Sequence, residues 1–294
     1  YQTVLPALAP FLILTQLLTV SGGAGLLVKP VYPLVSRLFH VSASGTYILL
    51  CGLLCGYPLG AKLCGDYFRQ GKISQKEAQY LLAFCCHPSP MFLLGYVRQQ
   101  LPVDINSGLL LLSVCLPVPL LSFLAQKLYQ PQTGGQRTSS PVRLETAPVC
   151  LESILLSSAE TMVLIGGCMM MFSIFALWIR QLSILPVRLQ ALVAGAVEMT
   201  TGIHQISTVF PKYTAVAPAL SAAAFGGISG IFQTKSVLSD SLIQEKHSQE
   251  GLPVTSKNAG GLSIRHYVLW KLIHAGLTCI AAQLLIHLMQ PLGL

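Results

Sequence analysis

Charged residues are scarce in this chain, and their scarcity excludes an ordinary soluble domain. Only 10% of the 294 residues are Asp, Glu, Lys or Arg, whereas 53% are hydrophobic, and the mean hydropathy is +0.65. Soluble globular domains carry about 25% charged residues. We therefore expect an all-α, polytopic membrane protein, because helices satisfy their own backbone hydrogen bonds in lipid. The expected setting is a bacterial cell membrane that the chain crosses several times.

The residue sets that carry enzyme chemistry are also missing. The sequence contains no HExxH motif, no paired-carboxylate site and no Ser, His and Asp set, so we expect no enzymatic activity. The glycines of the SGGAG segment are not followed by the GK[ST] of a phosphate-binding loop, and they are typical of a helix end. Nine cysteines lack the spacing of a disulfide framework or a zinc site. We expect no metal and no cofactor.

The net charge of +8 does not require nucleic acid as a partner. The basic residues lie mostly in loops, where they attract anionic lipid headgroups and fix the orientation of the chain. We therefore expect membrane lipid as a partner and no nucleic acid. The cluster of Lys62, Arg69, Lys72 and Lys76 favours the cytoplasmic side for its loop.

Apolar runs alternate with two long polar stretches. The runs occupy residues 4–20, 46–55, 81–97, 108–125, 161–179, 189–197, 214–232 and 268–289. Several approach the roughly 20 residues that a helix needs to cross the hydrocarbon. We divide the chain into a first membrane repeat (1–128), a polar linker (129–148) and a second membrane repeat (149–294) with a polar loop at about 235–265. The chain begins with Tyr1, not Met, so the sequence leaves open whether a further segment precedes it.

One interrupted pattern occurs twice, about 140 residues apart. CGYPLGAKL is followed by AFCCHPSPMF in the first half, and VEMTTGIHQI by AFGGISGIFQ in the second. Pro removes a hydrogen-bond donor and Gly relaxes the backbone, so helices should break there. The pattern predicts two pseudo-symmetric repeats that contain broken or re-entrant helices. Three crossings plus one re-entrant hairpin in each half would make the repeats inverted, whereas four crossings would make them parallel; we favour the inverted arrangement.

Paired breaks in two halves of a membrane protein point to a transporter's binding site. A half-helix that begins at such a break presents free backbone N–H groups, which attract an anion. The predicted substrate-binding residues are Gly56, Tyr57, Pro58, Gly60, Lys62, His87 and Ser89 in the first half, and Glu198, Thr200, Thr201, Gly202, Gly226, Gly227, Ser229 and Gln233 in the second.

Three of these candidates have a structural alternative. An acidic residue at membrane depth costs about 2.5–3.5 kcal/mol on insertion scales, so Glu198 is either a proton or cation relay, a partner of Lys62, Lys235 or His204, or an acceptor for free backbone amides. Lys62 either attracts an anionic solute or snorkels to the interface. His87 either takes part in solute or proton binding or is a hydrogen-bonded core residue.

At GYPLGAKL and three further motifs the chain resembles the sporulation integral membrane protein YlbJ family, within the wider group of nucleoside-recognition or Gate domain membrane proteins. The other residues of the resemblance are LPALAPFLILTQLL near the start, Phe84 with Pro90 and Phe92, Glu198 with Thr200 and Gly202, and Phe225, Gly226, Gly227 and Gln233. The family usually has Asn where this chain has Cys86 and His87. The resemblance implies a role in endospore formation, with transport of dipicolinic acid, a small aromatic dianion, across the outer forespore membrane.

These observations lead to one hypothesis and two alternatives. We expect a transporter that moves a small anionic solute, dipicolinic acid on the resemblance, by alternating access. The alternatives are a non-transporting membrane scaffold for spore-envelope assembly and a nucleoside transporter, the latter by analogy with the wider group. The coupling ion and a homo-oligomeric assembly are left open.

Overall fold

The computed structural model describes residues 4–131, 151–182, 184–248 and 262–289. Within these ranges every regular element is a helix and no strand occurs, which confirms the predicted all-helical class. The helices that are long and apolar enough to cross a membrane are Ser107–Tyr129, Leu151–Arg180, Lys212–Leu238 and Ile264–Leu288. A bent pair near the start of the chain would make one further span.

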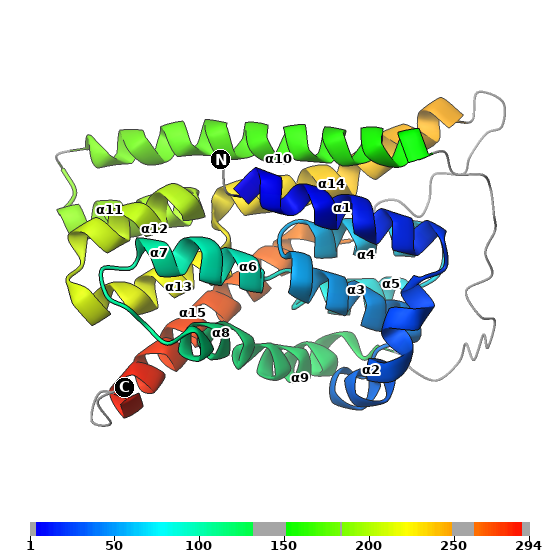
Figure 1. The fold of residues 1–294 in the computed structure, drawn as a ribbon, viewed down its shortest axis with the longest axis horizontal. Helices are drawn as coiled ribbons and strands as arrows, with labels where there is room; N and C mark the ends of the chain where they lie inside the picture. The colour runs from blue at the N-terminus through cyan, green and yellow to red at the C-terminus, as the bar shows by residue number, and fades with distance from the viewer. Residues whose placement is uncertain (1–3, 132–150, 183, 249–261, 290–294) are drawn as a thin grey trace.

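This bent pair consists of α1 (Val4–Val20) and α2 (Ala24–Phe39), whose axes differ by 91°. Helix α1 packs against α10 (Leu151–Arg180) in the second half, whereas α2 turns away from it (Figure 1). Helix α2 exposes Leu26 and Leu34 and also carries Lys29. This composition is typical of a helix at the membrane interface.

A tight helical hairpin, hairpin 1, follows α2. It consists of α3 (Ala43–Cys55) and α4 (Leu59–Arg69), which lie side by side in Figure 1. The two backbones meet at glycines: a Cβ atom built on Gly60 would lie 3.2 Å from the Cα atom of Gly52. Residues Gly56, Tyr57 and Pro58 connect the helices and are called tip 1. The chain therefore reverses at the first predicted break.

The next helix is interrupted at the second predicted break. Helix α5 (Gln75–Leu82) ends before residues 83–89, called break 1, and α6 (Pro90–Phe92) resumes after them. Ser89 caps the new helix, because its hydroxyl accepts a hydrogen bond from the Phe92 N–H at 3.2 Å. The helix continues through the π-helical turn η1 (Leu93–Val97) and α7 (Arg98–Gln100). Helices α8 (Ser107–Cys115) and α9 (Pro117–Tyr129) complete the first half.

The second half follows the same order of elements after α10. Hairpin 2 consists of α11 (Val187–Val197) and α12 (Met199–Val209), joined at Glu198, which is called tip 2. The turn η2 (Lys212–Ala215) leads into α13 (Val216–Phe225), which ends at Gly226, called break 2. Helix α14 (Gly227–Ser248) follows, and α15 (Ile264–Met289) is the last described helix.

Helix α14 continues to Ser248, so the first part of the polar segment at about 235–265 is helical. Packing on α4 extends this helix: Val237 is buried, and the Leu238 carbonyl accepts a hydrogen bond from Arg69 at 3.2 Å. The rest of that segment up to residue 261, and residues 132–148 of the predicted linker, lie outside the described residues. Tyr129, the first linker residue, belongs to α9.

Helix α15 joins the two halves. It packs against α13 in its own half and against α8 and α9 in the first half, and it runs obliquely across the helices in Figure 1. Tyr267, Trp270, Lys271 and His274 on this helix are all buried. A lysine side chain is therefore held inside the helix bundle, next to the interruptions of the first half.

Candidate functional site

The four interruptions meet in space. A Cβ atom on Gly56 in tip 1 would lie 3.2 Å from the His87 carbonyl oxygen in break 1. A Cβ atom on Gly226 in break 2 would lie 3.0 Å from the Tyr57 ring of tip 1. One on Gly227, the residue after break 2, would lie 3.3 Å from the Glu198 Cα atom in tip 2. Tip 1 thus touches both breaks, and the residue that follows break 2 touches tip 2.

Backbone conformation explains why glycine occupies two of these positions. Gly56 has φ of 77° and Gly226 has φ of 82°, in a region that other residues adopt only with strain. Each glycine also lies against a neighbouring interruption, so a side chain would separate the elements. The glycines that the sequence pattern singled out therefore allow both the turns and their close approach.

Tyr57 of tip 1 contacts two helices of the second half. Its hydroxyl donates a hydrogen bond to the Ala224 carbonyl of α13 at 2.6 Å, just before break 2. The same hydroxyl accepts a hydrogen bond from the Lys271 ammonium or amine of α15. A single phenol therefore connects tip 1, break 2 and the last helix.

Lys271 was not among the predicted site residues. Its side chain is only 1% exposed, and its Nζ atom also donates to the Cys86 carbonyl of break 1 at 2.8 Å. The Nζ atom lies 4.4 Å from the centroid of the Tyr57 ring. Among the described residues, no carboxylate oxygen lies within 4.0 Å of it. The cluster of Tyr57, Cys86, Lys271 and the Ala224 carbonyl is called the lysine cluster below.

A signal for Lys271 was present in the sequence. It is the one Lys within the apolar run 268–289, and a charged side chain at that depth is as costly as the carboxylate of Glu198. Tyr96 was missed as well: its hydroxyl donates to the Thr200 carbonyl at 2.9 Å, which ties η1 to hairpin 2. Nothing in the sequence pattern indicated this second contact.

Glu198 caps the second arm of hairpin 2. It is 1% exposed, and its carboxylate accepts from the backbone N–H groups of Thr200 and Thr201 at 3.1 and 2.7 Å. It also accepts from the Thr200 hydroxyl at 2.5 Å. These contacts match the structural alternative, in which the acid binds free amides at the break. The N-terminus of α12 thus holds the chain's own carboxylate, and it leaves little room there for an anion from outside.

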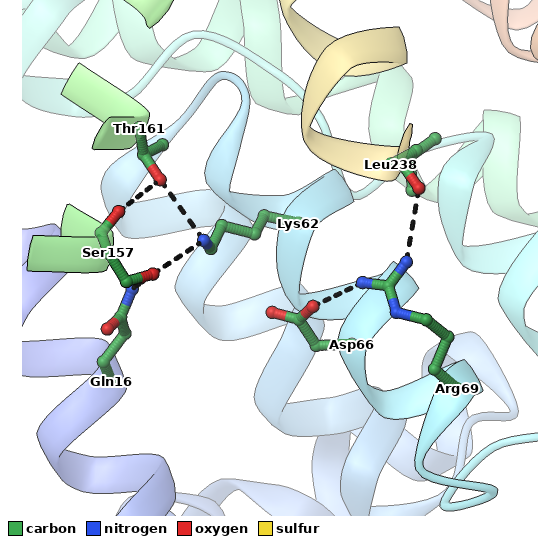
Figure 2. Close-up of polar contacts among 7 residues, drawn as sticks. All are labelled: Gln16, Lys62, Asp66, Arg69, Ser157, Thr161 and Leu238. Atoms are coloured by element: carbon green, nitrogen blue, oxygen red, sulfur yellow. Dashed lines mark hydrogen bonds and ion pairs between the residues drawn. The ribbon is translucent and has the colours of Figure 1, made fainter. Parts of the chain in front are cut away.

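Lys62 lies on another side of hairpin 1. Figure 2 shows its Nζ atom donating to Thr161 at 3.2 Å and to Ser157 at 3.5 Å, both on α10. The Gln16 amide of α1 donates to the same Ser157 hydroxyl at 3.4 Å. Lys62 is partly buried and ties α4 to α10. The structure does not bring it into the lysine cluster.

The remaining predicted residues fall into two groups. Polar side chains bond within or between helices: the buried Gln233 donates to Ser229 in the same helix at 3.0 Å, and the partly buried Thr201 of α12 donates to Ser173 of α10 at 3.0 Å. Gly60 and Gly202 allow the hairpin arms to pack; a Cβ atom on Gly202 would lie 2.8 Å from the Ala194 carbonyl carbon. Pro58 follows Tyr57 through a cis peptide bond in tip 1.

His87 differs from the other buried polar residues of the predicted site. It lies in break 1, is 1% exposed, and its Nε2 atom has no hydrogen-bond partner among the described residues. A buried polar atom of this kind usually has a partner. Within the described ranges, no group of three or more His, Cys, Asp or Glu side chains gathers to hold a metal ion.

Comparison with known proteins gives one informative match. The chain is 27% identical over 198 residues to the sporulation integral membrane protein YlbJ of Bacillus subtilis (strain 168), and the match covers 60% of this chain and 48% of that protein. The chain thus spans about half the length of this curated relative. No family model and no solved structure matches the chain. The match agrees with the motifs, and the chain is a multi-pass integral membrane protein related to the sporulation protein YlbJ.

Proposed function

We propose that this chain is a membrane transporter that binds a small anionic solute between the two tips and the two breaks and moves it by alternating access. The proposal rests on one observation: helix interruptions from both halves of the chain contact one another around the lysine cluster. Interrupted helices at membrane depth are tolerated where they are buried in protein or line a cavity, and transporters use them to form sites between repeats.

The proposed solute is dipicolinic acid, moved across the outer forespore membrane during endospore formation. The relationship to a sporulation integral membrane protein supports a sporulation setting. The buried Lys271 lacks an acidic partner in the described part of the chain, which favours a ligand that carries carboxylates. Its contact with an aromatic ring, that of Tyr57, suits a solute that combines charge with a flat ring.

We further propose that the two halves are inverted repeats. Each half contains a helical hairpin, a broken helix and a final long helix, in the same order. If both hairpins are re-entrant, each half crosses the membrane an odd number of times, and the second half has the opposite orientation. Cysteine accessibility at Ser74 and Lys212, which follow hairpin 1 and hairpin 2, tests this arrangement: labelling from opposite sides of the membrane is expected, and labelling from one side would refute it.

Uptake by proteoliposomes tests the proposed function. Liposomes with the purified chain and loaded with unlabelled dipicolinate should accumulate labelled dipicolinate by exchange. The Tyr57→Phe variant removes a hydroxyl of the lysine cluster and should reduce this exchange, whereas Tyr213→Phe on the exposed turn η2 serves as the matched control. Inhibition by uridine would favour the nucleoside alternative. Folded protein that exchanges neither solute would refute transport and favour the scaffold.

A further inference from the structure

The hydrogen-bond partners of Lys271 fit a neutral amine better than an ammonium ion. An ammonium has three N–H donors, and a neutral amine has two. Two oxygen acceptors surround Nζ among the described residues: the Tyr57 hydroxyl and the Cys86 carbonyl. A third N–H would therefore lack an oxygen acceptor, apart from the face of the Tyr57 ring. Leaving a buried charged donor unpaired is costly.

At their ordinary pKa values, the titratable groups around Lys271 carry no negative charge near neutral pH. Tip 1 contributes Tyr57, and break 1 contributes Cys85, Cys86 and His87; α15 itself contributes Tyr267 and His274. Phenols, thiols and imidazoles are uncharged or cationic near pH 7 at their ordinary pKa values. On α8, the Val114 carbonyl is hydrogen-bonded to His274 at 3.1 Å. On α14, the Thr234 hydroxyl donates to Tyr267 at 3.1 Å.

A buried cation without a counter-charge is unfavourable, and an anionic solute would supply that charge. We propose that Lys271 is a neutral amine in the empty site and takes up one proton when the anionic solute binds, so that solute and proton are bound together. This inference rests on the proposed function and names the coupling ion of the same site. The balance is simple: the lone pair of Nζ forms an N–H bond with a proton released by a buffer acid in solution, whose bond to that proton breaks and whose conjugate base stays in solution. The resulting ammonium pairs with a solute carboxylate, and no covalent bond of the solute changes.

The surroundings of Lys271 provide a route by which a solute carboxylate reaches the Nζ atom. Tyr57 lies between Lys271 and break 2 and donates to Ala224, so a carboxylate reaches Nζ when tip 1 and break 2 separate. That separation is the movement that alternating access requires. The buried Nε2 atom of His87, without a hydrogen-bond partner among the described residues, follows Cys86 by one residue. It offers a second polar contact once the solute has entered.

Proton uptake measured by calorimetry tests the inference directly. Dipicolinate is titrated into the detergent-purified full chain at about pH 8 in buffers that differ in ionisation enthalpy. The slope of the observed enthalpy against the buffer enthalpy gives the number of protons taken up, which should be about one per dipicolinate. Because a proton enters with the anion, the affinity for dipicolinate should fall about tenfold for each pH unit above about pH 8.

Two variants identify the group that takes up the proton. Lys271→Met should weaken binding by roughly tenfold or more and abolish the proton uptake, because a hydrogen-bonded charge is lost. The matched control is Lys127→Met on the exposed side of α9, which should bind dipicolinate and take up the proton as the original chain does. If Lys271→Met does not fold, two measurements on the original chain still test the inference: the number of protons taken up per dipicolinate, and the fall of the affinity with rising pH.

The possible results separate the two proposals. Dipicolinate binding without proton uptake overturns the role of Lys271 and leaves the proposed transporter intact. Proton uptake that persists in a folded Lys271→Met variant also overturns it. A monodisperse protein that binds no dipicolinate refutes the proposed function, and the coupling with it. Uptake of about one proton that disappears only in Lys271→Met supports both.

Discussion

Replacing Gly60 with Ala should push α4 away from break 1 and from α3. The distances allow the loss of folding free energy to be worked out. A Cβ atom at this position would lie 2.5 Å from the Cys85 carbonyl oxygen and 3.2 Å from both the Cys85 carbonyl carbon and the Gly52 Cα atom. These are all backbone atoms, so no side chain can rotate away. Ordinary van der Waals contact begins near 3.4 Å, so α4 and break 1 must separate by roughly 0.9 Å.

Overpacking of this kind costs about 1–3 kcal/mol. Because only backbone can move, we expect the upper part of the range, about 2–3 kcal/mol. At about 2–4 °C for each kcal/mol, the melting temperature should fall by about 4–12 °C. The assay is loss of the monodisperse gel-filtration peak after heating of the detergent-solubilised protein.

The matched control is Gly276→Ala, in the interior of α15. A Cβ atom there meets nothing within 4 Å, and alanine favours a helix over glycine by about 1 kcal/mol. This variant should melt about 2–4 °C higher than the original chain. If Gly60→Ala proves as stable as Gly276→Ala, α4 and break 1 do not pack as described, and the reasoning about the packing of hairpin 1 against break 1 fails with it.

Three further predictions use the same melting assay. Glu198→Ala should cost about 1–2 kcal/mol because α12 loses its cap, whereas Glu198→Gln keeps one accepting oxygen and should cost less; equal losses would contradict the capping role. Gly226→Ala should cost about 1–2 kcal/mol, since a residue with a Cβ atom is strained at φ of 82°, while Gly230→Ala, where nothing lies within 4 Å, should be neutral or stabilising. In a double-mutant cycle, Lys62→Met and Thr161→Val should show a coupling of about 0.5–1.5 kcal/mol, and additive effects would rule out the contact in Figure 2.

Backbone chemistry made the interruptions predictable. Pro58 and Pro90 cannot donate a hydrogen bond to a preceding turn, so neither lies inside a helix: α4 begins just after Pro58 and α6 begins at Pro90. Gly226 readily adopts a positive φ, and α13 ends there, so the helices are interrupted where the sequence predicts. Whether a broken run reverses or continues was harder to predict. Reversal depends on contacts such as that between Gly52 and Gly60, and a contact is a property of two segments rather than of one.

The candidate site was only partly predictable for the same reason. The cost of a charge in lipid singled out Glu198, but its role depends on the amides of Thr200 and Thr201, which become free only once α12 begins there. Lys271 was open to the same reasoning. Its acceptors, however, lie 214 and 185 residues away along the chain, and no local pattern indicates contacts at such separations.

The buried position of Lys271 has a consequence for how the chain enters the membrane. Helix α15 is the least apolar of the four span candidates. While the hydrogen-bond partners of Lys271 are not yet in place, this lysine raises the free-energy cost of transferring α15 into lipid. The oxygens that receive its hydrogen bonds belong to Tyr57 and Cys86, in the first half. We therefore expect stable insertion of α15 to require that hairpin 1 and break 1 have already assembled.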